Sequence, residues 1–174
     1  IGNQAKAQET LEKALEIDPD NEAANLNYGL LLAEQGRLLE AENALLTALK
    51  VNPKQAVAAY NLSVISSQKS LEKAIHYASI AAGSRPEEPK YSYTLAYYLM
   101  ENKQVSEAKK ILKNLVGEHP LYLSAVSFLA DIYLKEGNIE QAKQLYEQTL
   151  KTEGISPADR QAIKQALNSL RSSN

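Results

Sequence analysis

The sequence of 174 residues lacks cysteine and tryptophan altogether, and it has one phenylalanine and one methionine. Without cysteine the segment can form no disulfide, thiolate nucleophile, cysteine-ligated zinc site or covalent haem attachment. The absence leaves the compartment open, because a chain without cysteine suits the cytoplasm and the periplasm equally.

Long apolar runs and an excess of basic charge are also missing. The longest apolar run spans residues 95–100, whereas a membrane-spanning helix needs about 20 residues, so we expect no direct membrane insertion. With 19 Lys and Arg against 21 Asp and Glu, the formal net charge is -2, which argues against a nucleic-acid partner. No signal-peptide pattern opens the chain, and it starts at Ile1 instead of methionine. We therefore expect it to be a piece of a longer protein.

Glycine and proline are scarce, with seven and six residues, while alanine, leucine, glutamate and lysine are abundant, a composition that favours helix. The few prolines and some of the alanines recur at intervals of 33 or 34 residues. These positions are Pro19, Pro53, Pro86 and Pro120, and Ala7, Ala41, Ala74, Ala108 and Ala142. Each proline follows its alanine by twelve residues, so the chain is built from internal repeats.

The repeat divides the chain into six segments. Four complete units span 22–55, 56–88, 89–122 and 123–156, and the second unit is one residue shorter in its internal turn. Residues 1–21 match the second helix of a truncated unit, and 157–174 form a capping helix and tail.

The pattern of apolar residues in every unit predicts two amphipathic helices joined by a short turn. In the first unit Leu31 and Leu32 precede a turn at Gly36, after which Ala41 and Leu45 recur at helical spacing. No segment alternates like a strand, so the predicted fold class is all-α.

Small residues hold one position in each helix of the repeat. They are Gly29, Ser63, Ala96 and Ala130 in the first helices, and Ala41, Ala74, Ala108 and Ala142 in the second. Small side chains let helix axes approach closely, so we expect Gly29→Leu to unfold the array locally. The second unit has Ser66 and Ala78 where the first unit has Leu32 and Leu45, and we expect it to be thinly packed.

The period, the small residues, the turn glycine and the proline together resemble the tetratricopeptide repeat (TPR) family. The first unit reads Asn25-x2-Tyr28-Gly29-x2-Leu32, then Ala41-x3-Leu45, Ala48 and Pro53. The resemblance implies a right-handed α-solenoid of stacked antiparallel helix pairs. It also implies a non-catalytic scaffold that binds a protein or peptide segment in a concave groove lined by the first helix of each unit.

Carried onto this sequence, that lining supplies the candidate partner-binding residues. They are Leu26, Asn27, Leu30, Tyr60, Asn61, Val64, Lys90, Tyr93, Tyr97, Met100 and Asp131. We expect the tyrosine and aliphatic side chains to bury a ligand, and Asn27 and Asn61 to bond its backbone. The competing interpretation makes the tyrosines core residues. A clamp for a terminal carboxylate is less favoured, because Leu26 and Leu30 occupy places where such clamps carry polar groups.

Patterns for catalysis or metal binding are missing. His76 and His119 lie 43 residues apart without a metal or nucleophile spacing, and no glycine-rich phosphate loop occurs. We therefore expect no enzyme activity, no cofactor and no metal. Asn61-Leu62-Ser63 is formally a glycosylation motif, but it falls inside a predicted helix, where we expect no modification.

Two further interpretations stay open. The uncapped helix at residues 3–17 could make the chain a self-assembly module and homo-oligomer, or the chain could be the adaptor segment of a larger multi-domain enzyme or cofactor protein. RNA binding by a helical repeat is more remote, since the net charge of -2 opposes it.

Overall fold

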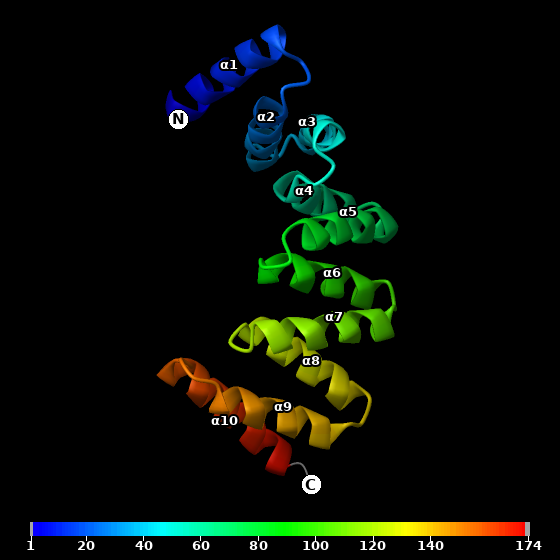
Figure 1. Ribbon diagram of the computed structural model, residues 1–174, viewed down its shortest axis with the longest axis vertical. Coiled ribbons are helices and arrows are strands. Elements are labelled where there is room, and N and C mark those ends of the chain that lie inside the picture. Colours follow the sequence, from blue (N-terminus) through cyan, green and yellow to red (C-terminus); the bar gives the residue numbers. More distant parts are fainter. Residues whose placement is uncertain (1, 173–174) are drawn as a thin grey trace. The chain divides into compact units, whose positions relative to one another are not determined.

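The computed structural model describes residues 2–172, which form ten α-helices and no strand (Figure 1). The helices are α1 Gly2–Ile17, α2 Glu22–Glu34, α3 Leu38–Val51, α4 Ala56–Ser67, α5 Leu71–Ser84, α6 Pro89–Glu101, α7 Val105–Glu118, α8 Leu123–Lys135, α9 Ile139–Lys151 and α10 Pro157–Ser172. The predicted all-α fold class is confirmed. Each of the four predicted complete units contains two of these helices, and α10 lies in the predicted capping segment.

Short turns reverse the chain between the two helices of a unit. Gly36 and Gly137 adopt φ angles of 75° and 77° in the turns before α3 and α9, a left-handed conformation that glycine accepts at little cost. Lys103 holds the matching place before α7 with φ 61°. After the shortened turn, α5 begins with a side-chain cap. The Ser70 hydroxyl accepts a hydrogen bond from the backbone N–H of Lys73 at 3.3 Å.

Asparagine side chains organise the entry into α2. The Asn21 side chain accepts a hydrogen bond from the backbone N–H of Ala24 at 2.9 Å and so caps the helix. The buried Asn25 amide donates to the carbonyl oxygens of Pro19 at 2.8 Å and Asn21 at 2.9 Å. These bonds fix the loop that joins α1 to α2.

The chain divides into two compact units, one ending at Asn102 and the other beginning at Lys103. In the first unit, each helix from α1 to α6 packs against the next along the chain. In the second unit α7 packs against α8, α8 against α9, and α9 against α10. The division falls between α6 and α7, inside the predicted repeat at 89–122.

The small residues of the repeat are all buried, as expected. At Gly29 a Cβ atom would lie 2.7 Å from Cγ of Leu45 on α3, closer than carbon atoms can approach. The core of the first unit surrounds this crossing with Leu32, Leu45 and Leu62. Burying each leucine side chain stabilises the fold by about 1.5–3 kcal/mol.

The expected thin packing of residues 56–88 is wrong. Seven residues of α4 are buried, and α4 and α5 pack together more extensively than any other helix pair described within either unit. The buried side chains of α5 are Ala74, Ala78 and Ala81. Small side chains here let the helices come close together instead of leaving a gap.

Candidate interaction surface

Ten of the predicted partner-binding residues lie in the compact unit that ends at Asn102. They are on α2, α4 and α6, each of which is the first helix of a repeat. We call these ten positions the first-helix face: Leu26, Asn27, Leu30, Tyr60, Asn61, Val64, Lys90, Tyr93, Tyr97 and Met100. The α2 and α4 helices contact each other, and the ring of Tyr60 on α4 lies against that of Tyr91 on α6. The fold thus brings these three helices together although each is about a repeat apart in sequence.

All ten residues of the first-helix face are exposed or half-buried. Val64 and Tyr97 are the most exposed of its large apolar side chains, with 42% and 45% of their surface accessible to solvent. Leu26, Leu30 and Tyr60 are half-buried and pack against a core cluster that extends from α2 to α6. The competing interpretation, which makes the tyrosines core residues, therefore applies in part to Tyr60, which packs on the core and also borders the surface.

Lys90 stands over a pair of aromatic rings. The Tyr60 and Tyr91 ring centroids are 5.3 Å apart at an interplanar angle of 47°. The Lys90 Nζ lies 5.6 Å from the centroid of Tyr60 and 5.1 Å from that of Tyr91, within the range of a cation–π interaction. Tyr91 was not among the predicted residues. It is buried, and its seven-residue spacing from buried Tyr98 marks the packing side of α6.

The ring of Tyr97 contacts the ring of buried Tyr98, the next residue in the sequence. Its ring stands edge-on to Tyr98, with centroids 5.7 Å apart and an interplanar angle of 66°. Tyr98 in turn packs with Ala74 and Ala78 of α5. The half-exposed ring of Tyr97 is therefore held at the surface by a buried aromatic beside it.

The side-chain amides of Asn27 and Asn61 each donate one hydrogen bond within their own helix. The Asn27 amide donates to the carbonyl oxygen of Ala23 at 2.8 Å, and the Asn61 amide donates to that of Val57 at 2.8 Å. Each acceptor lies one helical turn back on the same helix. A ligand would therefore meet mainly the Oδ1 acceptor and the second N–H of each amide.

Asp131 lies on α8 of the second unit, where its side chain is exposed. Burial raises the pKa of Tyr146 on α9, and the negative charge of Asp131 raises it further by a smaller amount. Asp131 therefore belongs to the second compact unit, whereas the ten residues of the first-helix face belong to the first.

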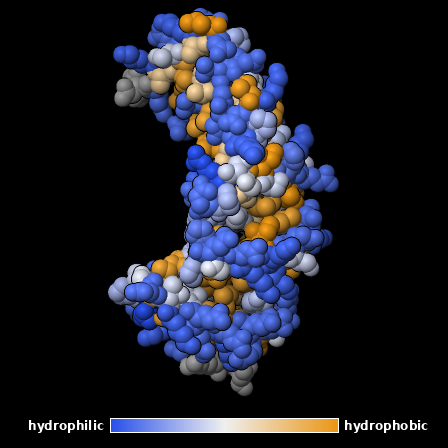
Figure 2. All heavy atoms as spheres, viewed as in Figure 1, coloured by the Kyte–Doolittle hydropathy of each residue, from blue (hydrophilic) through white to orange (hydrophobic). Residues whose placement is uncertain are grey.

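A cleft of about 880 Å³ opens between α1 and α2. Its lining is mostly apolar or neutral: Gln4, Lys6, Ala7, Thr10, Leu11, Asn27, Leu30, Leu31 and Glu34. Figure 2 shows apolar side chains at the surface in the part of the chain that holds α1 to α3. The repeat predicted an uncapped helix at residues 3–17, but it did not predict the cleft that this helix borders together with α2.

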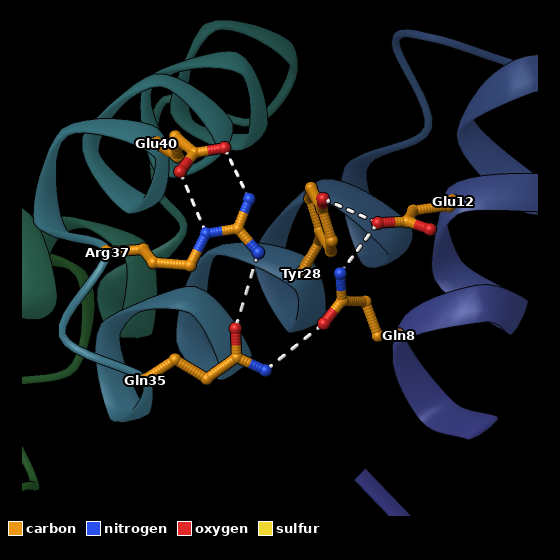
Figure 3. A network of polar contacts seen from close by, with 6 residues as sticks. All are labelled: Gln8, Glu12, Tyr28, Gln35, Arg37 and Glu40. Carbon is orange, nitrogen blue, oxygen red and sulfur yellow. Dashed lines mark hydrogen bonds and ion pairs between the residues drawn. The ribbon is translucent and has the colours of Figure 1, made fainter. Parts of the chain in front are cut away.

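A polar network joins α1 to α2 and to the turn before α3 (Figure 3). Glu12 accepts hydrogen bonds from the Gln8 amide at 2.8 Å and from the Tyr28 hydroxyl at 3.0 Å. Gln35 continues the chain of contacts, donating to Gln8 at 3.2 Å and accepting from Arg37 at 3.4 Å.

Arg37 ends this network by pairing through two nitrogens with both carboxylate oxygens of Glu40. The hydrogen bonds from Gln8 and Tyr28 lower the pKa of Glu12, and the bonds from Arg37 lower the pKa of Glu40. Burial, reinforced by the bond to Glu12, raises the pKa of Tyr28. Helix α1 is thus joined to α2 by a charge-assisted bond from Tyr28 to Glu12, and to the turn before α3 by a bond from Gln35 to Gln8.

The second unit has a smaller cavity of about 390 Å³. It is lined by α7, α8, α9 and their connecting residues, and Lys113 Nζ lies 5.7 Å from the centroid of the Tyr133 ring. Nearby, Lys109 pairs with Glu136 and lowers its pKa. Among the described residues there is no group of three or more His, Asp or Glu side chains placed to hold a metal ion. No helix in the described part is long and apolar enough to cross a bilayer.

Stacked helix pairs with small residues at their crossings define a helical-repeat protein, a class that works through its surfaces. One family model of the tetratricopeptide repeat matches residues 2–62 and 99–167. Another model of the same repeat matches residues 36–89. The chain therefore belongs to the tetratricopeptide repeat family. The family supports a general role as a protein-interaction scaffold with protein partners.

Solved structures show the same fold. A MamA crystal structure is 18% identical with a TM-score of 0.75, covering 86% of this chain and 88% of that chain. PilF of Pseudomonas aeruginosa is 22% identical with a TM-score of 0.72, covering 99% and 81%. YrrB, described as a TPR protein with an unusual peptide-binding site, is 18% identical with a TM-score of 0.71, covering 95% and 85%. No curated protein sequence matches the chain.

Proposed function

We propose that this chain is a non-catalytic scaffold that binds a peptide or protein segment along the first-helix face. The observation that carries the proposal is the group of half-exposed rings on α4 and α6, where Lys90 lies over Tyr60 and Tyr97 is 45% exposed. Rigid tyrosines bury apolar area while their hydroxyls stay in water, which suits a recognition surface. The peptide-binding site named for YrrB supports the same kind of ligand here.

The arrangement favours contact by side chains over dense hydrogen bonding to a ligand backbone. Asn27 and Asn61 each spend one N–H on their own helix, and Leu26 and Leu30 keep an apolar strip beside Asn27. Lys90 adds one positive charge next to the rings. We therefore propose a ligand whose aliphatic or aromatic side chains lie on the tyrosines, with an acidic group near Lys90.

The test replaces Tyr97 by alanine and measures affinity for peptides selected on the wild-type protein from a random library. We expect Tyr97→Ala to weaken binding about tenfold or more, as loss of an aromatic anchor does. The matched control is Leu39→Ala, which removes a side chain 67% exposed on α3, outside the first-helix face. We expect this control to bind like the wild type.

Stability measurements on the same variants separate the two roles of the ring. We expect Tyr97→Ala to lower the free energy of unfolding by about 0.5–1.5 kcal/mol through its contact with Tyr98. A loss of about 3–5 kcal/mol would place the ring in the core and contradict the proposal. Equal binding by wild type and Tyr97→Ala would contradict it as well.

A further inference from the structure

We propose that the cavity between α7, α8 and α9 binds a small aromatic ring that carries a carboxylate, and that Lys113 pairs with this carboxylate. The cavity lies within the second compact unit and has a volume of about 390 Å³, which is in the size range of ligand pockets. Its lining includes the buried side chains of Leu129, Tyr133, Leu145 and Thr149. The site is separate from the first-helix face, whose residues belong to the other compact unit.

The repeat provides a counterpart of this cavity in the first compact unit. Helices α7, α8 and α9 lie two repeats after α3, α4 and α5. Three residues that line the cavity therefore have equivalents in the core cluster of the first compact unit. The matching pairs are Val116 and Leu49, Leu129 and Leu62, and Thr149 and Ala81.

A tyrosine of the chain itself packs on that core cluster. Tyr77 and Ile80 of α5 are half-buried and pack against the cluster. Their equivalents on α9 are Leu145 and Gln148, and both of these border the cavity. Leucine is smaller than tyrosine and the Gln148 side chain is exposed, so space remains open where the first compact unit holds a phenol ring. An aromatic ring is therefore the group that this lining accepts.

The charge of the lining indicates the substituent on the ring. Of the described residues that line the cavity, Lys113 alone is charged, and its equivalent on α3 is Leu46. Its Nζ lies 5.7 Å from the centroid of the Tyr133 ring, so the positive charge stands beside one wall of the cavity. The carboxylate of Glu136 is already paired with Lys109. A ligand carboxylate can therefore pair with Lys113 while its ring enters the cavity.

Thr149 adds a polar atom to the buried part of the lining. Its side chain is buried, and its hydroxyl donates a hydrogen bond to the carbonyl oxygen of Leu145 at 3.0 Å. The hydroxyl oxygen can still accept a hydrogen bond. A ring with a phenolic O–H, like that of Tyr77, therefore suits the cavity better than an unsubstituted ring.

The experiment titrates the isotope-labelled whole protein with para-hydroxyphenylacetate and follows the backbone amide signals by NMR. We expect saturable changes in α7, α8 and α9 at no more than about 10 mM ligand. The neutral amide of the same acid should bind about two- to fivefold more weakly, because it lacks the charge that pairs with an exposed lysine. A peptide that ends in tyrosine with a free carboxylate is titrated in parallel. The tighter of the two carboxylates shows whether the ring comes from a free acid or from the carboxy terminus of a protein.

Variants that fill the cavity test its position. Leu145→Tyr places on α9 the residue that α5 has at Tyr77, and we expect it to abolish saturable binding. Gly117→Leu adds bulk to the lining from α7 and should weaken binding about tenfold or more. Its control is Gly83→Leu at the equivalent position of α5, outside the lining. An added Cβ at either glycine meets nothing within 4 Å, so both variants should fold.

A second pair of variants tests the charge. Lys113→Met keeps most of the side-chain length without the ammonium group, and it should weaken binding of the acid about two- to fivefold. It should leave binding of the neutral amide unchanged. Lys110→Met, at an exposed position of α7 outside the lining, should bind the acid like the wild type.

Four outcomes would overturn the proposal. They are no saturation of the wild type up to about 10 mM acid, equal binding of the acid and its amide, equal binding by the Gly117→Leu and Gly83→Leu proteins, and signal changes confined to the first-helix face. Circular dichroism melting checks that the variants fold. If Leu145→Tyr does not fold, the two glycine variants decide the position of the site. None of these results depends on the test of Tyr97.

Discussion

At the scale of single residues, two helical glycines have opposite surroundings. Gly29 on α2 faces Leu45, so that an added Cβ would lie 2.7 Å from Cγ and 3.2 Å from the backbone nitrogen. Gly83 on α5 has nothing within 4 Å of such an atom. Leu45 is fully buried, whereas the surroundings of Gly83 leave room for a methyl group.

The same substitution should therefore have opposite effects at the two sites. We expect Gly29→Ala to lower the free energy of unfolding by about 1–3 kcal/mol through overpacking. Gly83→Ala should raise it by up to about 1 kcal/mol, because alanine loses less backbone entropy in a helix. Urea denaturation of both variants measures the two changes, and an equal shift in one direction would contradict this account.

Other residue-level features could not be predicted from the sequence. Lys103 adopts φ 61° at the turn position that Gly36 and Gly137 hold in other repeats, because the turn geometry prevails over the conformational preference of lysine. Asn25 occupies a position usual for a large aromatic residue, and its amide instead bonds the carbonyls of Pro19 and Asn21. The partial engagement of Asn27 and Asn61 depends on rotamers, which spacing alone does not specify.

At the scale of elements, the docking of α1 depends on a carboxylate. Glu12 accepts hydrogen bonds from Gln8 and Tyr28, and these bonds lower its pKa below 4.5. The folded state therefore binds fewer protons than the unfolded state near that pH. The resulting stabilisation is complete above pH 4.5 and is lost as the pH falls through the lowered pKa of Glu12.

We expect Glu12→Gln to weaken this acid dependence. The melting temperature of the wild type should fall between about pH 5 and pH 3 more steeply than that of the variant. Glu16→Gln, on the same helix and outside the network of Figure 3, serves as the control. Identical pH profiles for the wild type and Glu12→Gln would show that the network does not contribute to stability.

Helix positions were largely predictable, because proline and small-residue spacing specify where each hairpin lies. The cleft between α1 and α2 was not, since its volume depends on how far the two helices separate. The expectation for the second repeat failed for a related reason. Ser66 and Ala78 have small side chains, but the backbones of α4 and α5 lie close together there, so that no gap is left.

At the scale of the whole molecule, the chain contains two compact units, each with buried residues of its own. In repeat proteins each helix pair is stabilised mainly by its nearest neighbours. Local damage should therefore remain local. Helix α10 offers a test, because its side chains Ile163 and Leu167 are buried.

We expect Ile163→Ala to destabilise the second unit by about 2–5 kcal/mol. Hydrogen exchange should then quicken in α8, α9 and α10 while protection in α2 to α4 stays near that of the wild type. For comparison, Ala162→Gly at an exposed position of α10 lowers helix propensity without removing a buried side chain. Uniform loss of protection along the chain would show that the two units unfold as one.

The aromatic pairs described above have an optical consequence. The sequence has ten tyrosines and no tryptophan, so its ultraviolet emission comes from tyrosine alone. Tyr60 and Tyr91, and Tyr97 and Tyr98, lie as ring pairs on or beside the first-helix face. A ligand that brings a tryptophan onto Tyr97 would take up excitation energy from these rings and emit at longer wavelength, so its arrival could be followed without an attached dye.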